Sequence, residues 1–207
     1  MTSTRIPTRT RILEAALAAL RDEGIAGISA RTIARYGDFN QALIFYHFGS
    51  VDALLVAVAR SESERRSALY AEALRDVTSL RELVAVARRL HEEEFQAGTV
   101  AALTQMIAGA VGTAELAQGI REAFEPWTKL VGESIARVLA DTPYAGILPE
   151  GDLTTAVAAL FLGIELLVGL DPDAAAGESL FTTMEAVATL VDGLLLQVVP
   201  EPDPSRP

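Results

Sequence analysis

The stretch ISARTIARYGDFNQALIFYHFGSVDALL, residues 28–55, limits the possible fold of this chain more than any other. Ser29 is a good N-cap, because its hydroxyl can accept a hydrogen bond from an unpaired amide in the first turn of a helix. A helix over 30–36 follows this cap, and Gly37 and Asp38 end it, since glycine tolerates a positive φ and aspartate bonds its own backbone. The first element predicted here is therefore a short helix with a sharp end.

A second short helix follows the turn. Asn40 caps it, and the helix runs to Phe48 with Leu43 and Ile44 pointing at the core. The polar and aromatic residues on either side of Leu43 and Ile44 are predicted to lie on the outer face of the helix. Two short helices joined by a turn of this length match the helix-turn-helix, which reads DNA by placing its second helix in the major groove.

The composition of the chain excludes some kinds of site but says little about its fold class. The chain has 207 residues, which suits one domain or two small ones, and it contains no cysteine, so disulfides and thiolate metal sites are excluded. The N-terminus has arginines but no apolar stretch of the kind found in a secretory signal. The most apolar segment, 153–170, contains Glu165, and we expect no membrane span. A cytoplasmic location is the simplest interpretation.

The net charge of −11 is unevenly distributed along the chain. Residues 1–50 hold six arginines against four acidic residues, whereas residues 51–207 hold eleven basic residues against twenty-four acidic ones. A segment with an excess of positive charge suits contact with phosphate, and a strongly acidic remainder does not. The distribution therefore favours contact with nucleic acid by the first part of the chain only.

Helical patterns occupy almost the whole chain, and no segment has the pattern of a convincing strand. Apolar residues recur every three to four positions, and Ser, Pro or Gly stands at the segment ends. Pro126 either kinks a long helix or begins a new one, and the Pro- and Gly-rich segment 142–151 is a loop. The sequence therefore predicts an all-α fold with helices over 8–23, 30–36, 40–48, 50–74, 79–96, 99–110, 113–140, 152–170 and 178–199.

The middle of the fourth predicted helix, RSESERRS at 60–67, is polar on every side. Such a helix is expected where it bridges two domains through solvent. We therefore predict a three-helix DNA-binding domain over 1–50 and a helical effector-binding and dimerisation domain over 51–199, with the helix over 50–74 joining them. The proline-rich tail, 200–207, is predicted to be disordered.

The last two predicted helices carry more apolar surface than one small domain needs. The helix over 178–199 has apolar residues on two faces, and the one before it is apolar nearly all round. They are either a deeply buried core pair or a dimer interface in which two chains form a four-helix bundle. We favour the dimer, because a twofold axis matches a palindromic DNA site. The predicted interface residues are Leu160, Leu167, Leu180, Met184, Val187, Val191 and Leu194.

Residues 9–59 resemble the TetR family of bacterial one-component transcriptional regulators. The similarity rests on the segment RTRILEAALAALRDEGIAGIS, on the pair Ile33 and Ala34, and on NQALIFYHFGS followed by DALL. The rest of the chain resembles the family only in layout. The resemblance implies a homodimer that binds an operator through its first three helices and releases it when a small molecule enters the second domain.

When the DNA contacts of the family are transferred to this sequence position by position, the resemblance implies base contacts at the start of the recognition helix and phosphate contacts farther along it. Asparagine and glutamine can pair with adenine through two hydrogen bonds, and alanine can touch a thymine methyl group. Tyrosine and histidine can donate to phosphate, and helix N-termini favour anions. The predicted DNA-binding residues are Ser29, Arg31, Thr32, Asn40, Gln41, Ala42, Phe45, Tyr46 and His47.

Three positions depart from the family pattern. Asp38 brings a negative charge to the turn, Val51 stands where the family favours lysine, and Phe45 replaces a common tyrosine. Each change removes attraction or a hydrogen-bond donor at the phosphates. We therefore expect DNA binding that is weaker and more dependent on low salt than is usual for the family.

The second predicted domain has few polar groups suited to catalysis. His91 begins the run HEEEF, but no second histidine lies nearby, so a solvated helix face explains the run better than a zinc site. No nucleophile elbow or phosphate-binding glycine loop occurs, and we expect neither an enzyme nor a cofactor. An apolar pocket with a few orienting polar groups is more plausible, with ordinary core packing as the alternative for most of its residues. Its predicted lining is Tyr70, His91, Phe95, Met106, Phe124, Trp127 and Glu165.

The sequence leaves two functions open. The first is a repressor that binds a palindromic operator as a homodimer and is released by a small, largely apolar effector. The second is a helical small-molecule-binding protein whose DNA binding is weakened or lost, for which Asp38 and Val51 are the evidence. A helical enzyme is a third class, but no constellation of residues supports it.

Overall fold

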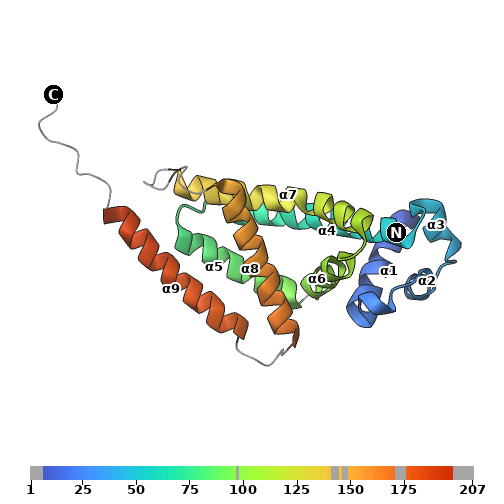
Figure 1. Cartoon of the computed structure of the whole chain (residues 1–207). Coiled ribbons are helices and arrows are strands. Elements are labelled where there is room, and N and C mark those ends of the chain that lie inside the picture. The colour runs from blue at the N-terminus through green and yellow to red at the C-terminus, as the bar shows by residue number, and fades with distance from the viewer. Residues whose placement is uncertain (1–6, 97, 141–144, 146–148, 171–175, 198–207) are drawn as a thin grey trace, which may run out of the picture. The chain divides into compact units, whose positions relative to one another are not determined.

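The computed structural model describes residues 7–96, 98–140, 145, 149–170 and 176–197, and every regular element among them is helical (Figure 1). This architecture confirms the predicted all-α fold. The elements are α1 (Thr8–Glu23), the short 3-10 helix η1 (Ile25–Gly27), α2 (Ala30–Gly37), α3 (Ala42–Phe48), α4 (Val51–Ala73), α5 (Leu80–Gln96), α6 (Thr99–Ala110), α7 (Ala114–Leu139), α8 (Glu150–Leu170) and α9 (Ala176–Gln197).

The helix bounds agree with the sequence pattern to within two residues wherever the structure describes the chain. The pattern did not predict η1, and Pro126 lies inside a continuous α7 rather than at the start of a new helix. The predicted loop at 142–151 lies mostly outside the described residues, although α8 already begins at Glu150. The tail at 200–207 lies wholly outside them.

The chain divides into two compact units. The N-terminal unit consists of residues 1–66 and 94–127, and the C-terminal unit consists of residues 67–93 and 128–207. The first break, between residues 66 and 67, lies in the polar segment 60–67 that the sequence marks as the bridge between two domains, and not at residue 50. In addition, α6 and the first half of α7 join the first helices. The division by function, with DNA binding in 1–50 and effector binding in 51–199, stays a prediction.

The core of the N-terminal unit forms around α1. Its fully buried side chains come from one face of α1 and from the inner faces of the helices that pack on it, as the 3.6-residue period predicts. Removing this apolar surface from water holds the short helices α2 and α3, which would be marginal alone. The fully buried apolar residues include Ile12, Ala16, Ala19 and Leu20 of α1, Ile33 of α2, Ile44 of α3, Leu54 and Ala59 of α4, and Ala102 and Met106 of α6.

Two glycines allow close helix contacts in this unit. A Cβ on Gly109 would lie 2.6 Å from Cγ1 of Ile25, and a Cβ on Gly119 would lie 2.7 Å from Cγ2 of Val56. The Ile25 amide also donates to Oε1 of Gln105 at 2.9 Å, which satisfies a backbone group at the start of η1. These contacts explain why α6 and the start of α7 belong with the first helices.

The C-terminal unit is joined by polar contacts as well as by a small core. Asp192 of α9 accepts hydrogen bonds from the backbone amides of Leu80 at 3.1 Å and Arg81 at 2.9 Å. A carboxylate at this position satisfies unpaired amides of the first turn of α5 and offsets the helix dipole. Arg88 of α5 also pairs with Glu178 of α9. The core beside these contacts consists of Ile164, Val168 and Phe181, with Val84, Ala87, Leu180 and Met184 packed against it.

The polar segment 60–67 of α4 is not solvated on every side. Ser63 is 0% exposed and Arg66 is 3% exposed, so the prediction of a helix surrounded by solvent is wrong at these two positions. The physical reason is a partner from α5, because Arg66 Nε donates to Oε2 of Glu94 at 3.0 Å. A buried charge is tolerated when it is paired and hydrogen-bonded.

The run HEEEF in α5 is likewise only partly solvated. Glu92 and Glu93 are exposed as predicted, but His91 is 7% exposed. The His91 ring packs against the aromatic rings of Phe161 and Phe181, with centroids 6.1 and 5.1 Å away. The aromatic contacts favour burial of the imidazole, so the solvated-face prediction is wrong for His91.

Helices α8 and α9 leave large apolar side chains exposed. Leu166 and Leu167 of α8 and Val187, Leu190 and Leu194 of α9 are each more than half exposed. By length and composition alone, the stretch Gly151–Val168, with a mean hydropathy of 1.7, is able to cross a membrane. Exposed apolar surface of this kind also marks protein interfaces.

Candidate DNA-binding site

Two hydroxyl groups fix the start of α2. Ser29 Oγ accepts a hydrogen bond from the Thr32 amide at 3.1 Å and lies 2.8 Å from Thr32 Oγ1. Thr32 Oγ1 in turn donates to the Gly27 carbonyl at 3.0 Å. Both hydroxyls are therefore engaged within the protein, and phosphate contact at this end of α2 would fall mainly to Arg31, which is exposed.

Replacing Ser29 by alanine is expected to lower the free energy of unfolding by about 1 kcal/mol, the usual cost of losing an N-cap hydroxyl. Thermal unfolding followed by circular dichroism would measure this loss. Ser61→Ala is the matched control, since Ser61 is exposed within α4 and its loss should change little. Equal melting temperatures for the two variants would show that the Ser29 cap contributes no stability.

The turn after α2 leaves room only for glycine at its first position. A Cβ on Gly37 would lie 2.9 Å from the Ala15 Cβ and 2.0 Å from the Phe39 ring. Asp38 then adopts a left-handed conformation with φ 49° and ψ 56°, and the Phe39 amide donates to the Ala34 carbonyl at 3.1 Å. The predicted sharp end of the helix is confirmed, and it leaves the Asp38 side chain exposed.

Helix α3 buries one side and exposes the other. Ile44 is fully buried, whereas Phe45 is 50% exposed and Tyr46 is 82% exposed. The rings of Tyr46 and His47 meet edge to face, with centroids 5.0 Å apart. Large exposed aromatic side chains are uncommon on a helix without a partner surface, and a phenol can donate to phosphate.

The two polar residues before α3 differ in what they can offer to a base. Asn40 Oδ1 accepts a hydrogen bond from the Ala42 amide at 2.9 Å, so its acceptor serves the turn. Two-point pairing with adenine needs both an acceptor and a donor on the same amide. Gln41 is exposed and has a longer side chain. We therefore expect Gln41 to contribute more than Asn40 to adenine recognition.

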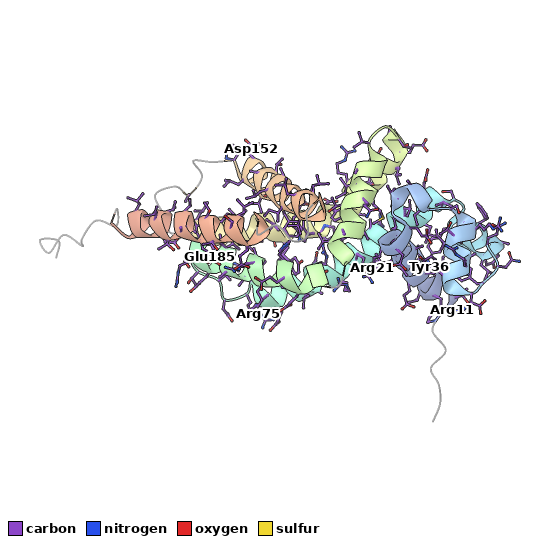
Figure 2. All side chains as sticks on the ribbon, turned by 90° about the horizontal axis from the view of Figure 1, so that it is seen from below. Arg11, Arg21, Tyr36, Arg75, Asp152 and Glu185 are labelled. Atoms are coloured by element: carbon purple, nitrogen blue, oxygen red, sulfur yellow. The ribbon has the colours of Figure 1, made fainter. Side chains whose placement is uncertain are left out.

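A cluster on α1 and α2 reduces the positive charge available to DNA. Glu23 Oε1 accepts from Arg35 Nη2 at 2.7 Å and from the Tyr36 hydroxyl at 3.2 Å. Burial, followed by hydrogen bonding to Asp22 and Glu23, raises the pKa of Tyr36 to about 12, so its hydroxyl stays protonated near neutral pH. Figure 2 shows Tyr36 within the helices of the N-terminal unit. Arg35 therefore offers a partly neutralised charge.

Two arginines of α1 contact the helix-turn-helix and stabilise it. Arg11 Nη2 donates to the Gly37 carbonyl at 3.0 Å, and Figure 2 shows Arg11 in the same unit as Tyr36. The guanidinium of Arg9 lies 5.0 Å from the centroid of the Phe48 ring, within cation–π range. The excess positive charge of this segment thus supports the turn and the end of α3 as well as any phosphate contact.

The predicted pocket residues lie in both units. Met106 is fully buried in the core of the N-terminal unit, which agrees with ordinary packing for that residue. The side chains of Phe95 and Glu165 lie outside what the structure describes. The pocket as a whole stays a prediction. Of the remaining residues, Phe124 and Trp127 belong to the N-terminal unit, and Tyr70 and His91 belong to the C-terminal unit.

A different hollow of about 410 Å³ opens between α5 and α9 of the C-terminal unit. None of the predicted pocket residues lines it. Glu82 is one of the residues that line it, and hydrogen bonds from the Thr78 amide and hydroxyl hold the pKa of that carboxyl below its ordinary value. The hollow is lined by Arg81, Glu82, Ala85, Thr182, Glu185, Ala186 and Thr189.

The predicted dimer residues fall into two groups. Leu180 and Met184 pack partly against the core of their own unit, which limits what they can offer a second chain. Leu190, which the sequence argument missed, is 70% exposed and lies one turn from Val187 and Leu194 on α9, so the helical period could have found it. Of the others, Leu160, Leu167, Val187 and Leu194 are exposed and Val191 is half-buried.

A model of the bacterial regulatory proteins of the tetR family matches residues 12–58, from within α1 to the first turns of α4. The N-terminal segment of the chain is therefore similar to that of TetR-family proteins. The matched segment contains the whole helix-turn-helix, α2 and α3. No curated protein sequence matches the chain.

Solved structures extend the similarity to the fold of the whole chain. A TetR-family member from Streptomyces coelicolor A3 has 26% identity and a TM-score of 0.64, covering 89% of this chain and 98% of that one. A TetR-family transcriptional regulator from Rhodococcus sp. has 20% identity and a TM-score of 0.72, covering 87% and 97%. The regulator FadR from Bacillus subtilis, in complex with stearoyl-CoA, has 13% identity and a TM-score of 0.69, covering 86% and 96%.

Proposed function

We propose that this chain is a cytoplasmic transcriptional repressor of the TetR family that binds a palindromic operator as a homodimer and is released by a small, largely apolar effector. The observation that carries the proposal is the outer face of α3. Gln41, Phe45 and Tyr46 are exposed there on a helix that Ile44 fixes to the core. A rigid helix with polar and aromatic side chains on its free face suits the major groove and the adjoining phosphates.

The dimer is supported by the exposed apolar residues of α8 and α9. Four of the large exposed apolar side chains lie on α8 and three on α9, within one unit of the chain. Pairing these two helices with the same two helices of a second copy gives a closed twofold assembly. The twofold axis then relates two helix-turn-helix segments to two operator half-sites.

The apolar effector is supported more indirectly. The B. subtilis regulator that shares this fold is in complex with stearoyl-CoA, a ligand with a long apolar chain. The likeness to that protein is one of fold, and it indicates only that such a fold can enclose an apolar ligand. Release follows if the ligand favours a conformation in which the two recognition helices no longer fit the operator.

A footprint on the DNA upstream of the gene would test the proposal. The wild-type chain should protect a symmetric site, and the double variant Gln41→Ala/Tyr46→Ala should lose at least about a hundredfold in affinity, since a good base contact is worth about 1–3 kcal/mol and a phosphate contact adds to it. The matched control, Glu115→Ala/Gln118→Ala, changes two exposed residues of α7. Protection of the same site by the double variant would show that these contacts are wrongly assigned.

A second function is favoured by one observation. Asp38 exposes its carboxylate in the turn beside α3, where it would repel phosphate. A helical small-molecule-binding protein with weakened DNA binding would have this feature. No footprint for the wild-type chain even at low salt, together with recovery of one in Asp38→Gly, would favour this second function.

A further inference from the structure

Two buried hydrogen-bond donors lie one turn apart on the same side of α4. The Ser63 hydroxyl is 0% exposed and has no hydrogen-bond partner among the described residues. Three residues later, Arg66 is 3% exposed, and its Nη2 also finds no partner in the described part of the chain. A buried donor without an acceptor costs about 1–3 kcal/mol, so two of them side by side indicate an acceptor outside the described residues.

Several helical hydroxyl groups find acceptors within their own helix, whereas those of Ser63, Ser67 and Thr104 are buried and find no partner among the described residues. Ser134 donates to the Leu130 carbonyl at 2.8 Å, and Thr155 and Thr182 make the same four-residue contact in α8 and α9. Such bonds are the usual way for a helix to satisfy a buried hydroxyl. Ser63 lacks this contact, although it is more deeply buried than Ser134, so its hydroxyl is available to a ligand.

The charges around Arg66 are already balanced. Glu94 Oε2 accepts from Arg66 Nε at 3.0 Å, and both Glu94 oxygens accept from Arg65 Nη2 at 3.0 and 2.9 Å. Arg65 Nε also pairs with Glu62 at 3.0 Å. Two guanidinium groups thus meet two carboxylates in the N-terminal unit. An added charge would be uncompensated, and burying it would cost more than burying a neutral acceptor.

The buried residues of α4 that precede the two donors are apolar. Leu55, Val58 and Ala59 of α4 are all buried on the stretch that precedes Ser63. The core of the N-terminal unit also contains Leu103 and Met106 of α6. A molecule that reached the donors along this face would meet apolar side chains with its body and hydrogen-bond donors with one end.

We infer that Ser63 and Arg66 form the polar end of an effector site that takes an uncharged molecule with an apolar body and one carbonyl oxygen. The oxygen accepts from the Ser63 hydroxyl and from Arg66 Nη2, while Glu94 keeps the Arg66 side chain in place. This inference rests on the proposed function for the role of the ligand as an effector. It locates the orienting polar groups on α4, whereas the lining predicted from the sequence includes His91 of α5 and Glu165 of α8.

Calorimetry on the full chain with three nine-carbon probes tests the site. 2-Nonanone, nonanoate and nonylammonium share an apolar body and differ in the end group. The wild-type chain is expected to bind 2-nonanone at least tenfold more tightly than either charged probe. Ser63→Ala should weaken 2-nonanone binding at least fivefold without lowering the melting temperature, since the hydroxyl has no partner to lose among the described residues. Ser61→Ala, an exposed position on the same helix, should bind like the wild type.

Several results would overturn the inference. One is that 2-nonanone does not bind up to its solubility limit. Another is that nonanoate or nonylammonium binds more tightly than 2-nonanone. A third is that the wild type and Ser63→Ala bind the ketone with equal affinity. Arg66→Met is a second variant, and it should lose the preference for the ketone if it folds. An operator-binding assay separates the two proposals. If the ketone binds and operator affinity does not change, the binding site is supported but release by the effector is contradicted. If the chain binds the operator but not the ketone, the repressor function is supported and the proposed ligand site is contradicted.

Discussion

Replacing Glu94 by alanine is expected to lower the free energy of unfolding by about 3–5 kcal/mol, the usual cost of removing one partner of a buried ion pair. The side chains of Glu94 and Arg66 are only 5% and 4% exposed. Without the carboxylate, the Arg66 guanidinium stays buried with no counter-charge, and Arg65 loses its contacts with both Glu94 oxygens. Denaturant unfolding at a fixed protomer concentration would measure the change.

The neighbouring residue supplies a matched control for this variant. Glu93 precedes Glu94 in α5 but is exposed, so Glu93→Ala should change stability by less than about 0.5 kcal/mol. The two variants remove the same charge from the same turn of helix. A similar stability for both would contradict a buried pair between Glu94 and Arg66.

Local signals in the sequence were sufficient for the helices. The Ser29 hydroxyl, Gly37 and the helical period of Ile12, Ala16 and Leu20 act over fewer than five residues, and the structure shows the cap, the turn and the buried face that they predict. The TetR-family segment is also the part in which these signals follow one another most closely. Here local preference and tertiary packing agree, which is why short-range reasoning succeeds.

The polar interior could not be predicted in the same way. Arg66 and Glu94 are 28 residues apart, and each lies in a run of charged residues whose simplest interpretation is a solvated helix surface. Only the packing of α5 on α4 decides which members of each run turn inward. The opposite signs of the two runs were a signal that they could pair, but they did not indicate which residues would do so. For the same reason, the sequence could not separate Leu180, which packs inside its unit, from Val187, which is exposed.

The exposed apolar residues of α8 and α9 lead to the second large effect. Leu167 is 56% exposed and Leu190 is 70% exposed. If a second copy covers them, a glutamate at either position would be buried in the interface without a counter-charge. The variant Leu167→Glu/Leu190→Glu is therefore expected to be monomeric at micromolar concentration, where sedimentation would give a dimer for the wild type.

Loss of the dimer should also reduce operator binding by about a hundredfold or more, because two half-sites bound by one assembly gain effective concentration that separate monomers lack. Val111→Glu is the control, since Val111 is 82% exposed in the turn after α6 and should tolerate the charge. Circular dichroism would verify that the double variant keeps its helices. If it stays dimeric, the interface lies elsewhere; if it is monomeric and still binds the operator at full strength, each recognition helix acts alone and the palindromic site is not needed.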